Sequence, residues 1–499
     1  MQPFDVKSCS QIDMSKFQWC SSQDNYQKLR KIIIEELDNW KVVNNLEQFN
    51  VIYFQVLKAL VEYITIYYDV QKAKNYDQIK FDQINNNFVK NILEKKKINE
   101  IYNYDLELKR FPQKKINFLL SKFYLKLGSV FKKKLIISKN ELIQTYIGND
   151  NSFLYLPPIY LLQIPNKNSI KKNKSTKILA KSILDRLVVY DNIFDQIILD
   201  NIENIINVYL NRFEIDIKKI DTLKSSFVSC DVIVTGTGDQ YFNQLISYYS
   251  KINNIKNYRF DHGGEKSFFI DKKFLNSEIQ FIDSYFTYSP KLQKNYQDIF
   301  KNNNIRFNGK FGTVKSLSLE KISRLKSNTK TSGSRKIIYV QQSFVGNSRN
   351  IDIRLNDNLL YYWQFHLFKN LKCRGHKIYI KKHPKGDDII KPLINMTFKI
   401  YDKKFSDLLS EDDIFIFDFV GTAFIEALIA KKKVILIDNQ IRKVNPELFG
   451  EIRKCACVIK GFWKNNLPTV DFDNLCYEID KFKNSKEDND NFFYSKFYS

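Results

Sequence analysis

The chain has 499 residues, of which 43% are hydrophobic, so its length and composition predict two or three globular domains and exclude a disordered chain. A formal net charge of +24 favours partners that are polyanions: nucleic acid, an anionic membrane surface, or nucleotide and acidic-sugar substrates. The Lys-rich runs are spread along the chain, which favours solvated faces over a nucleic-acid-binding surface. We therefore expect no nucleic-acid partner.

Cysteine usage and hydropathy bear on the compartment. The 7 Cys residues show no zinc-site spacing, which favours reduced thiols in the cytoplasm. The start of the chain is polar and predicts no signal peptide. No apolar run approaches the roughly 20 residues that a membrane-spanning helix needs. We expect a cytoplasmic protein whose basic faces suit peripheral contact with the anionic inner face of the cytoplasmic membrane.

The first 315 residues are expected to form a helical region followed by a first α/β domain. Residues 1–150 are predicted to be mostly helical, because apolar residues recur with a helical period over 26–40 and 46–68. A first Rossmann-like domain is predicted over 151–315. Its elements are a long helical region from 178 to about 212, a buried strand that starts at 231 and runs into a Gly-containing turn, a helix over 240–250, and strands at 258–260 and 282–289.

A Lys- and Ser-rich linker over 316–334, with a short helix of its own, separates this domain from a second one over 335–483. A polar tail over 484–499 follows. The predicted strands of the second domain are 336–340, 378–380, 414–417 and 434–437, and its predicted helices are 359–371 and 423–430. Short β-branched apolar runs of this kind are typical of parallel strands buried on both faces. The fold class is therefore α/β.

Two polar turns are expected at the carboxyl edge of the second sheet. Gly421 and Thr422 stand where a strand ends and a helix begins, and such a junction offers backbone N–H groups and the positive end of a helix dipole to a phosphate. His383 follows a neighbouring parallel strand, so it belongs to the same edge, where ligands of open α/β sheets bind. This chemistry indicates a nucleotide-activated donor.

An ordered set of short motifs connects the two domains with a known family. The set consists of His262-Gly263, His383-Pro384, Gly421-Thr422 and Glu426. It resembles the GT-B glycosyltransferases, and more narrowly the bacterial surface-carbohydrate transferases: CDP-glycerol glycerophosphotransferases, capsule polysaccharide transferases and bacterial polysialyltransferases. The resemblance covers about 229–438 and implies two Rossmann-like domains that face each other across a cleft. This chain departs from the family at Asp418-Phe-Val-Gly-Thr422, where the family commonly has a hydroxyl residue in place of Gly421.

The candidate catalytic and acceptor-side residues follow a strand of the first domain. His262 is the candidate general base, because imidazole titrates near neutrality. Asp261 would orient the ring or serve as the base itself. Gly263 and Gly264 would let backbone and substrate approach closely, and Lys266 is a candidate contact for an acidic acceptor or donor.

The candidate donor-binding residues belong to the second domain. His383 would stabilise the departing phosphate without a metal, and Pro384 would fix its direction. Gly421 and Thr422 would hold phosphate oxygens, and Glu426 would accept hydrogen bonds from ribose or sugar hydroxyls. The remaining candidates are Lys382, Ser343 and Arg349. No metal or resident cofactor is predicted, and Asp412 and Asp413 are expected to be solvent or helix-start charges.

These residues predict a glycosyltransferase that moves a sugar or polyol phosphate from a nucleotide donor to a glycan or lipid-linked glycan acceptor. The resemblance implies a cytidine nucleotide and a metal-independent, inverting displacement. Three alternatives stay open: a nucleotide-sugar 2-epimerase of the same fold, a basic nucleic-acid-binding protein, and an inactive scaffold. An epimerase would need no acceptor, and a nucleic-acid-binding protein would bind oligonucleotides with a steep salt dependence.

Overall fold

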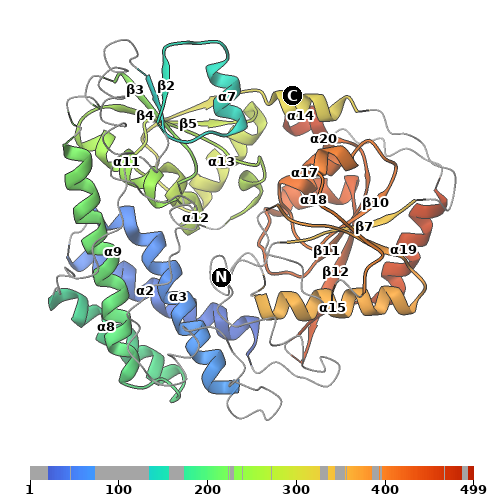
Figure 1. The fold of residues 1–499 in the computed structure, drawn as a ribbon, viewed down its shortest axis with the longest axis horizontal. Helices are drawn as coiled ribbons and strands as arrows, with labels where there is room; N and C mark the ends of the chain where they lie inside the picture. The colour runs from blue at the N-terminus through green and yellow to red at the C-terminus, as the bar shows by residue number, and fades with distance from the viewer. Residues whose placement is uncertain are drawn as a thin grey trace. The chain divides into compact units, whose positions relative to one another are not determined.

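The computed structural model describes residues 21–44, 47–73, 134–156, 174–222, 230–238, 240–270, 272–325, 335–342, 357–384, 396–465, 467–485 and 493–499, with a few single residues between these ranges. The chain divides into two compact units (Figure 1). The six-stranded unit comprises Lys31–Leu60 and Lys97–Ser316, and the seven-stranded unit comprises Met1–Arg30, Val61–Lys96 and Leu317–Ser499. Each unit is built around one sheet, and each is described by itself.

The sheet of the six-stranded unit is parallel throughout, in the order β2-β1-β3-β4-β5-β6. Its strands are β1 (Lys134–Ile136), β2 (Phe153–Tyr155), β3 (Val232–Thr235), β4 (Lys256–Phe260), β5 (Ser284–Thr287) and β6 (Lys310–Thr313). β1 lies within the region 1–150 that we predicted to be mostly helical, so this sheet begins before residue 151. The sequence pattern did not indicate β1 because only its last two residues are apolar.

Helices cover both faces of this sheet, as expected for parallel strands. They are α7 (Glu141–Ile147), α11 (Tyr241–Ile252), α12 (Lys272–Ile279) and α13 (Pro290–Asn302), with a 3₁₀ turn η3 (Lys266–Phe268) after β4. On one face, the ring of Tyr146 in α7 lies 5.0 Å from that of Phe260 and 5.3 Å from that of Phe286. On the other face, Tyr285 of β5 packs against Tyr296 of α13, ring centroids 5.2 Å apart, and their hydroxyls are hydrogen-bonded.

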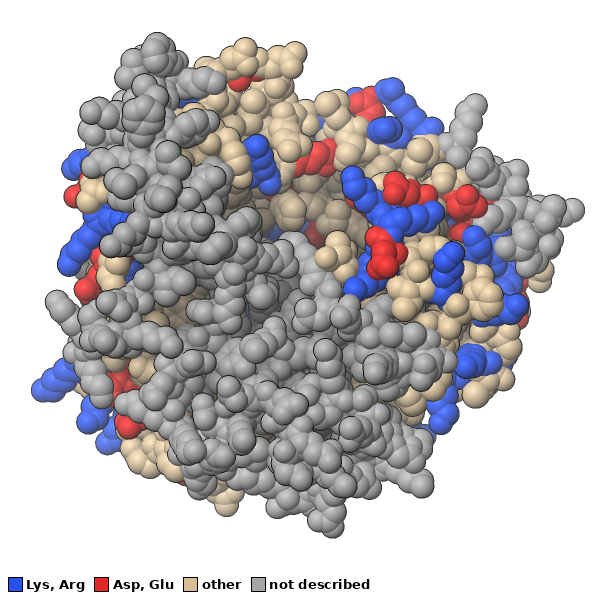
Figure 2. Space-filling view, viewed as in Figure 1, with Lys and Arg blue, Asp and Glu red and all other residues tan. Residues whose placement is uncertain are grey.

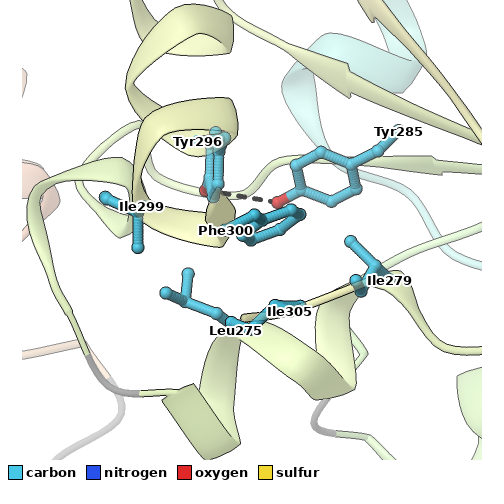
Figure 3. Packing of buried hydrophobic residues seen from close by; sticks show 7 residues of the cluster. All are labelled: Leu275, Ile279, Tyr285, Tyr296, Ile299, Phe300 and Ile305. Atoms are coloured by element: carbon cyan, nitrogen blue, oxygen red, sulfur yellow. Dashed lines mark hydrogen bonds between the residues drawn. The ribbon is translucent and has the colours of Figure 1, made fainter. Parts of the chain in front are cut away.

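This second contact belongs to a buried cluster that fixes α12 and α13 on the sheet (Figure 3). Its members are Leu275, Ile279, Tyr285, Tyr296, Ile299, Phe300 and Ile305. Because side chains from α12, α13 and β5 share one apolar interior, the cluster holds both helices against the sheet.

Four further helices precede β3 in the chain. They are α2 (Gln23–Val43), α3 (Phe49–Ala73), α8 (Lys174–Tyr190) and α9 (Ile197–Asp221). α8 packs against α9, and Arg186 of α8 pairs with Glu35 and Glu36 of α2 at 2.6 and 3.0 Å. By length and composition α3 could cross a membrane, but 83% of the window that qualifies is buried inside the protein. A core helix passes the same test, so this is weak evidence for a membrane span.

The sheet of the seven-stranded unit has the order β13-β12-β11-β10-β7-β8-β9, and its strands are parallel except for β13. They are β7 (Ile337–Val340), β8 (Ile378–Lys381), β9 (Lys399–Tyr401), β10 (Ile414–Phe417), β11 (Lys433–Asp438), β12 (Cys457–Lys464) and β13 (Leu467–Val470). The helical elements are α14 (Leu317–Ser323), α15 (Asp357–Cys373), η4 (Phe405–Leu408), α17 (Thr422–Ile429), α18 (Pro446–Cys455), α19 (Phe472–Asn484) and α20 (Phe493–Phe497).

Alternation along the central strands explains how both faces of this sheet are covered. Tyr339 of β7 points toward α15, where its ring packs 5.1 Å from that of Phe368. Phe417 of β10 points to the opposite face and packs 5.4 Å from Phe424 of α17. β7, β10 and β11 are apolar on both faces, and every one of their residues except Asp438 is buried. The α/β class with largely parallel sheets is confirmed.

Two acidic residues differ from our expectation. Asp412 is buried and lies 2.7 Å from Arg335 and 3.5 Å from Lys433, and these cations hold its pKa below the usual value against the effect of burial. Asp413 is also buried and accepts a hydrogen bond from the backbone N–H of Lys336. These carboxylates are therefore interior anchors at the amino ends of β7, β10 and β11, and not the solvent or helix-start charges that we predicted.

Candidate functional site

The strand order of the seven-stranded sheet reverses between β7 and β10. From β7 the chain continues to β8 and β9 on one side, and β10 to β13 follow on the other side. Ligands of open α/β sheets bind outside the carboxyl ends of the strands at such a reversal, because the two loops lead away from each other. Gln341 and Gln342 follow β7 here, and Asp418 follows β10.

Asp418 anchors the turn that leads into α17. Its Oδ2 accepts hydrogen bonds from Tyr339 Oη at 2.6 Å and Trp363 Nε1 at 2.8 Å. Its Oδ1 accepts from Gln342 Nε2 at 2.9 Å. Burial raises the pKa of Asp418, and the three donors oppose that change. Both carboxylate oxygens accept hydrogen bonds from residues of the same unit, so the side chain holds the turn against β7 and α15.

Helix α17 begins after Gly421, an N-cap residue that has no side chain to cap the helix and that is buried and extended at φ −146°. A Cβ at this position would collide with the ring of Phe419. A residue with a side chain at this position would therefore require the ring of Phe419 to move. Thr422 is exposed at the first helical position, and Glu426 is half-buried one turn later.

Arg442 adds a cation beside this helix start. It lies in the loop after β11, and its Nη1 donates to the carbonyl of Val420 at 2.6 Å. Arg442 therefore places a guanidinium close to the start of α17, where the helix dipole is also positive. We missed Arg442 in the sequence because it follows Val420 by 22 residues and belongs to no motif.

The Lys-Lys-His-Pro turn follows β8, at the same edge of the sheet. Lys381 is buried, its ammonium donates to the carbonyl of Lys382, and burial lowers its pKa. Lys382 and His383 are half-buried and Pro384 is exposed. Of the two lysines, Lys382 is the more exposed. The predicted donor residues Ser343 and Arg349 lie outside the described residues.

The predicted catalytic residues follow β4 of the six-stranded sheet. Asp261 is fully buried, and its Oδ1 accepts from the backbone N–H of His262 at 2.7 Å. Gly263 and Gly264 both have the left-handed backbone that glycine adopts most readily, at φ 89° and 75°. The turn leaves His262 exposed, and Tyr288 Oη accepts from the N–H of Gly263 at 3.1 Å. The structure thus presents the imidazole on a fixed turn.

Lys266 is not on the rim of this edge, where we expected it to contact an acidic ligand. It is buried, and its Nζ lies 2.7 Å from Glu278 Oε1. Glu278 Oε2 also accepts from the backbone N–H of Gly238 at 3.0 Å, in the turn after β3. Arg259 donates to the carbonyls of Ser277 and Glu278, both at 2.9 Å. These contacts join the turns after β3 and β4 through the end of α12.

Burial raises the pKa of Asp261 to about 7. Lys266 opposes this change, whereas Glu265 and Glu278 add to it. The second carboxylate oxygen, Oδ2, is buried and has no hydrogen-bond partner, so few contacts compensate the charged form. Asp261 therefore binds a proton close to neutral pH. It is buried directly beside the exposed His262, from whose backbone N–H it accepts a hydrogen bond.

We expect Asp261→Asn to change the pH dependence of stability. In the folded protein the pKa of Asp261 is about 7, well above the ordinary value of an aspartate. The stabilisation that the protonated carboxyl gives the folded state is therefore complete below about pH 4 and is lost as the pH rises through about 7. Asn cannot ionise. As the pH rises between these limits, the free energy of unfolding of the variant should therefore increase by more than about 1 kcal/mol relative to that of the wild type. Urea titrations across this window measure it. Asp231→Asn, at an exposed position, is the control. If the free energy of unfolding of Asp261→Asn had the same pH dependence as that of the wild type, the prediction would be contradicted.

Among the described residues, no group of three or more His, Cys, Asp or Glu side chains is arranged to hold a metal ion. Metal-independent chemistry stays a prediction. No protein-family model matches this chain, and no curated protein sequence matches it. The features that remain are the start of α17 at Gly421 in one unit and the exposed imidazole of His262 in the other.

Proposed function

We propose that this protein is a GT-B-type glycosyltransferase, in which the seven-stranded unit binds a nucleotide-activated sugar or polyol phosphate and the six-stranded unit supplies the base. The observation that carries the proposal is the start of α17, with Gly421 as its N-cap residue and Arg442 beside it, at the point where the strand order of a Rossmann-type sheet reverses. The motif resemblance favours a cytidine nucleotide, and a surface glycan is the acceptor.

The proposed reaction is a direct displacement. His262 takes the proton of an acceptor hydroxyl as the oxygen forms a bond to the donor carbon. The bond from that carbon to the nucleotide phosphate breaks, and the phosphate oxygen leaves with the electron pair. The N–H groups at the start of α17, the hydroxyl of Thr422 and the ring of His383 stabilise this oxyanion. Asp261 positions His262 through the backbone hydrogen bond to its Oδ1.

A thermal-shift panel of CMP, CDP, UDP, GDP and ADP tests the donor site. At a concentration of about 100 times Kd, the nucleotide that fits should stabilise the folded protein by about 3 kcal/mol. The variants Thr422→Val and Arg442→Ala should reduce this shift, because each removes a group from the start of α17. Arg453→Ala, at an exposed arginine of α18, is the matched control. Failure of every nucleotide to raise the melting temperature would refute the proposed donor site.

A further inference from the structure

The outer edge of the seven-stranded sheet carries three aromatic rings. β8 and β9 form this edge, with Tyr379 opposite Lys399 and Lys381 opposite Tyr401. The rings of Tyr379 and Tyr401 are nearly parallel, with centroids 5.8 Å apart and 10° between their planes. Phe398 lies 5.2 Å from Tyr379 and is 61% exposed. Both tyrosines are half-buried, so a row of rings remains partly open to solvent.

Four lysines surround these rings. Lys336 lies 5.9 Å from the ring centroid of Tyr379, and Lys377 lies 5.2 Å from that of Phe398. Lys399 and Lys403 lie 5.6 and 5.7 Å from that of Tyr401. We call the seven residues the β8–β9 platform: Lys336, Lys377, Tyr379, Phe398, Lys399, Tyr401 and Lys403. Among the described residues of 377–403 the acidic residue is Asp402, so the four lysines of the platform outnumber the described carboxylate beside them.

Lys and Arg on the described part of the face shown in Figure 2 are interspersed with Asp and Glu. On the platform, by contrast, cations gather around apolar rings. An exposed cation–π contact is weak, so a lysine can move aside when a ligand covers the ring. The combination suits a ligand that has both flat apolar faces and negative charges.

The platform borders the proposed donor site. The backbone N–H of Lys382 donates to the carbonyl of Tyr401 at 3.2 Å, and His383 follows directly. A chain molecule that lies along β8 and β9 would therefore lead toward the carboxyl edge where the donor phosphate is proposed to bind. All four platform cations are lysines, whereas planar recognition of bases and phosphates favours arginine. This composition favours a glycan with spaced charges over nucleic acid.

We propose that the β8–β9 platform binds an anionic glycan, with sugar rings packed on Phe398, Tyr379 and Tyr401 and with carboxylates or phosphates paired with the lysines. The inference rests on the proposed function and specifies its acceptor: an acidic polysaccharide whose growing chain is retained between transfers. A retained chain would stay bound to the seven-stranded unit while successive sugars are added.

Binding of the full chain to oligogalacturonate, an anionic glycan, tests this inference without any nucleotide. We expect binding that weakens with salt, and no binding to dextran of similar length. Phe398→Ala should weaken binding about tenfold, because one ring face is lost. The triple variant Lys377→Gln/Lys399→Gln/Lys403→Gln should weaken it further and flatten the salt dependence. All four positions are exposed, so the melting temperature of each free variant should match that of the wild type.

The matched control removes the same charge elsewhere. Lys174→Gln/Lys177→Gln/Lys181→Gln changes three exposed lysines of α8 and should leave the affinity within about twofold, because long-range charge effects are screened. Equal weakening by both triple variants would overturn the inference, as would absent wild-type binding. Tighter, platform-dependent binding of oligo(dT) would assign the surface to nucleic acid instead. If the protein bound the glycan but no nucleotide stabilised it, the proposed transferase activity would be refuted. The glycan-binding role of the platform would then still stand.

Discussion

Lys266→Met should destabilise the six-stranded unit by about 3–5 kcal/mol, because it leaves a buried carboxylate without its cation. The side chains of Lys266 and Glu278 are only 6% and 0% exposed, and their charged atoms lie 2.7 Å apart. Met retains most of the apolar length of Lys, so the loss reports the charge and not a cavity. Urea titration measures the global effect, and hydrogen exchange in β4 and α12 measures the local one.

Two further variants separate burial from charge. Lys266→Met/Glu278→Gln removes both charges and keeps an acceptor for the N–H of Gly238, so it should be more stable than Lys266→Met alone. Lys251→Met breaks an ion pair with Glu47 of similar length, 2.8 Å, whose side chains are 54% and 64% exposed. That change should alter stability by less than about 1 kcal/mol. If Lys266→Met were no more harmful than Lys251→Met, the pair would not be an anchor of this edge.

This pair shows where sequence analysis stops. Glu278 belongs to α12 and Lys266 to a 3₁₀ turn 12 residues earlier, and no helical or strand period connects them. Only the packing of α12 beneath the turn after β4 brings them together. Asp418 is similar, since its three donors stand 55 to 79 residues earlier in the chain. Its place after a buried strand was visible in the sequence, but its partners were not.

The central strands were predictable for a local reason. The patterns at 378–380, 414–417 and 434–437 gave β8, β10 and β11 to within about one residue at each end, because strands buried on both faces are apolar throughout. The peripheral strands were not indicated. β9 is short and partly charged, β12 contains Gly461, and β13 contains Pro468, which edge strands tolerate. β9 and β13 are the edge strands of this sheet and β12 lies next to one, and strands near an edge are more solvated, so their sequences lack the continuous apolar run.

His262→Ala should lower turnover about 10²- to 10⁴-fold, the contribution typical of a positioned general base. His262 is exposed, so its removal should leave the melting temperature of the free protein unchanged. The thermal shift produced by the donor nucleotide should also be retained, because the proposed phosphate site belongs to the other unit. His383→Ala should lose both turnover and much of the nucleotide shift, since it would remove a phosphate contact.

The comparison of these two variants decides between a catalytic and a binding role. His262→Gln keeps a polar side chain at the same turn but cannot accept a proton near neutral pH, so it should be as slow as His262→Ala if His262 is the base. Full turnover by either His262 variant would remove the assignment and leave Asp261 as the group that binds a proton near pH 7 at this edge. Because Asp261 is fully buried, it could reach an acceptor only after the Gly263-Gly264 turn opens. Substitution of Gly264 with Ala would then slow turnover, since the added Cβ restricts the left-handed backbone that the turn requires.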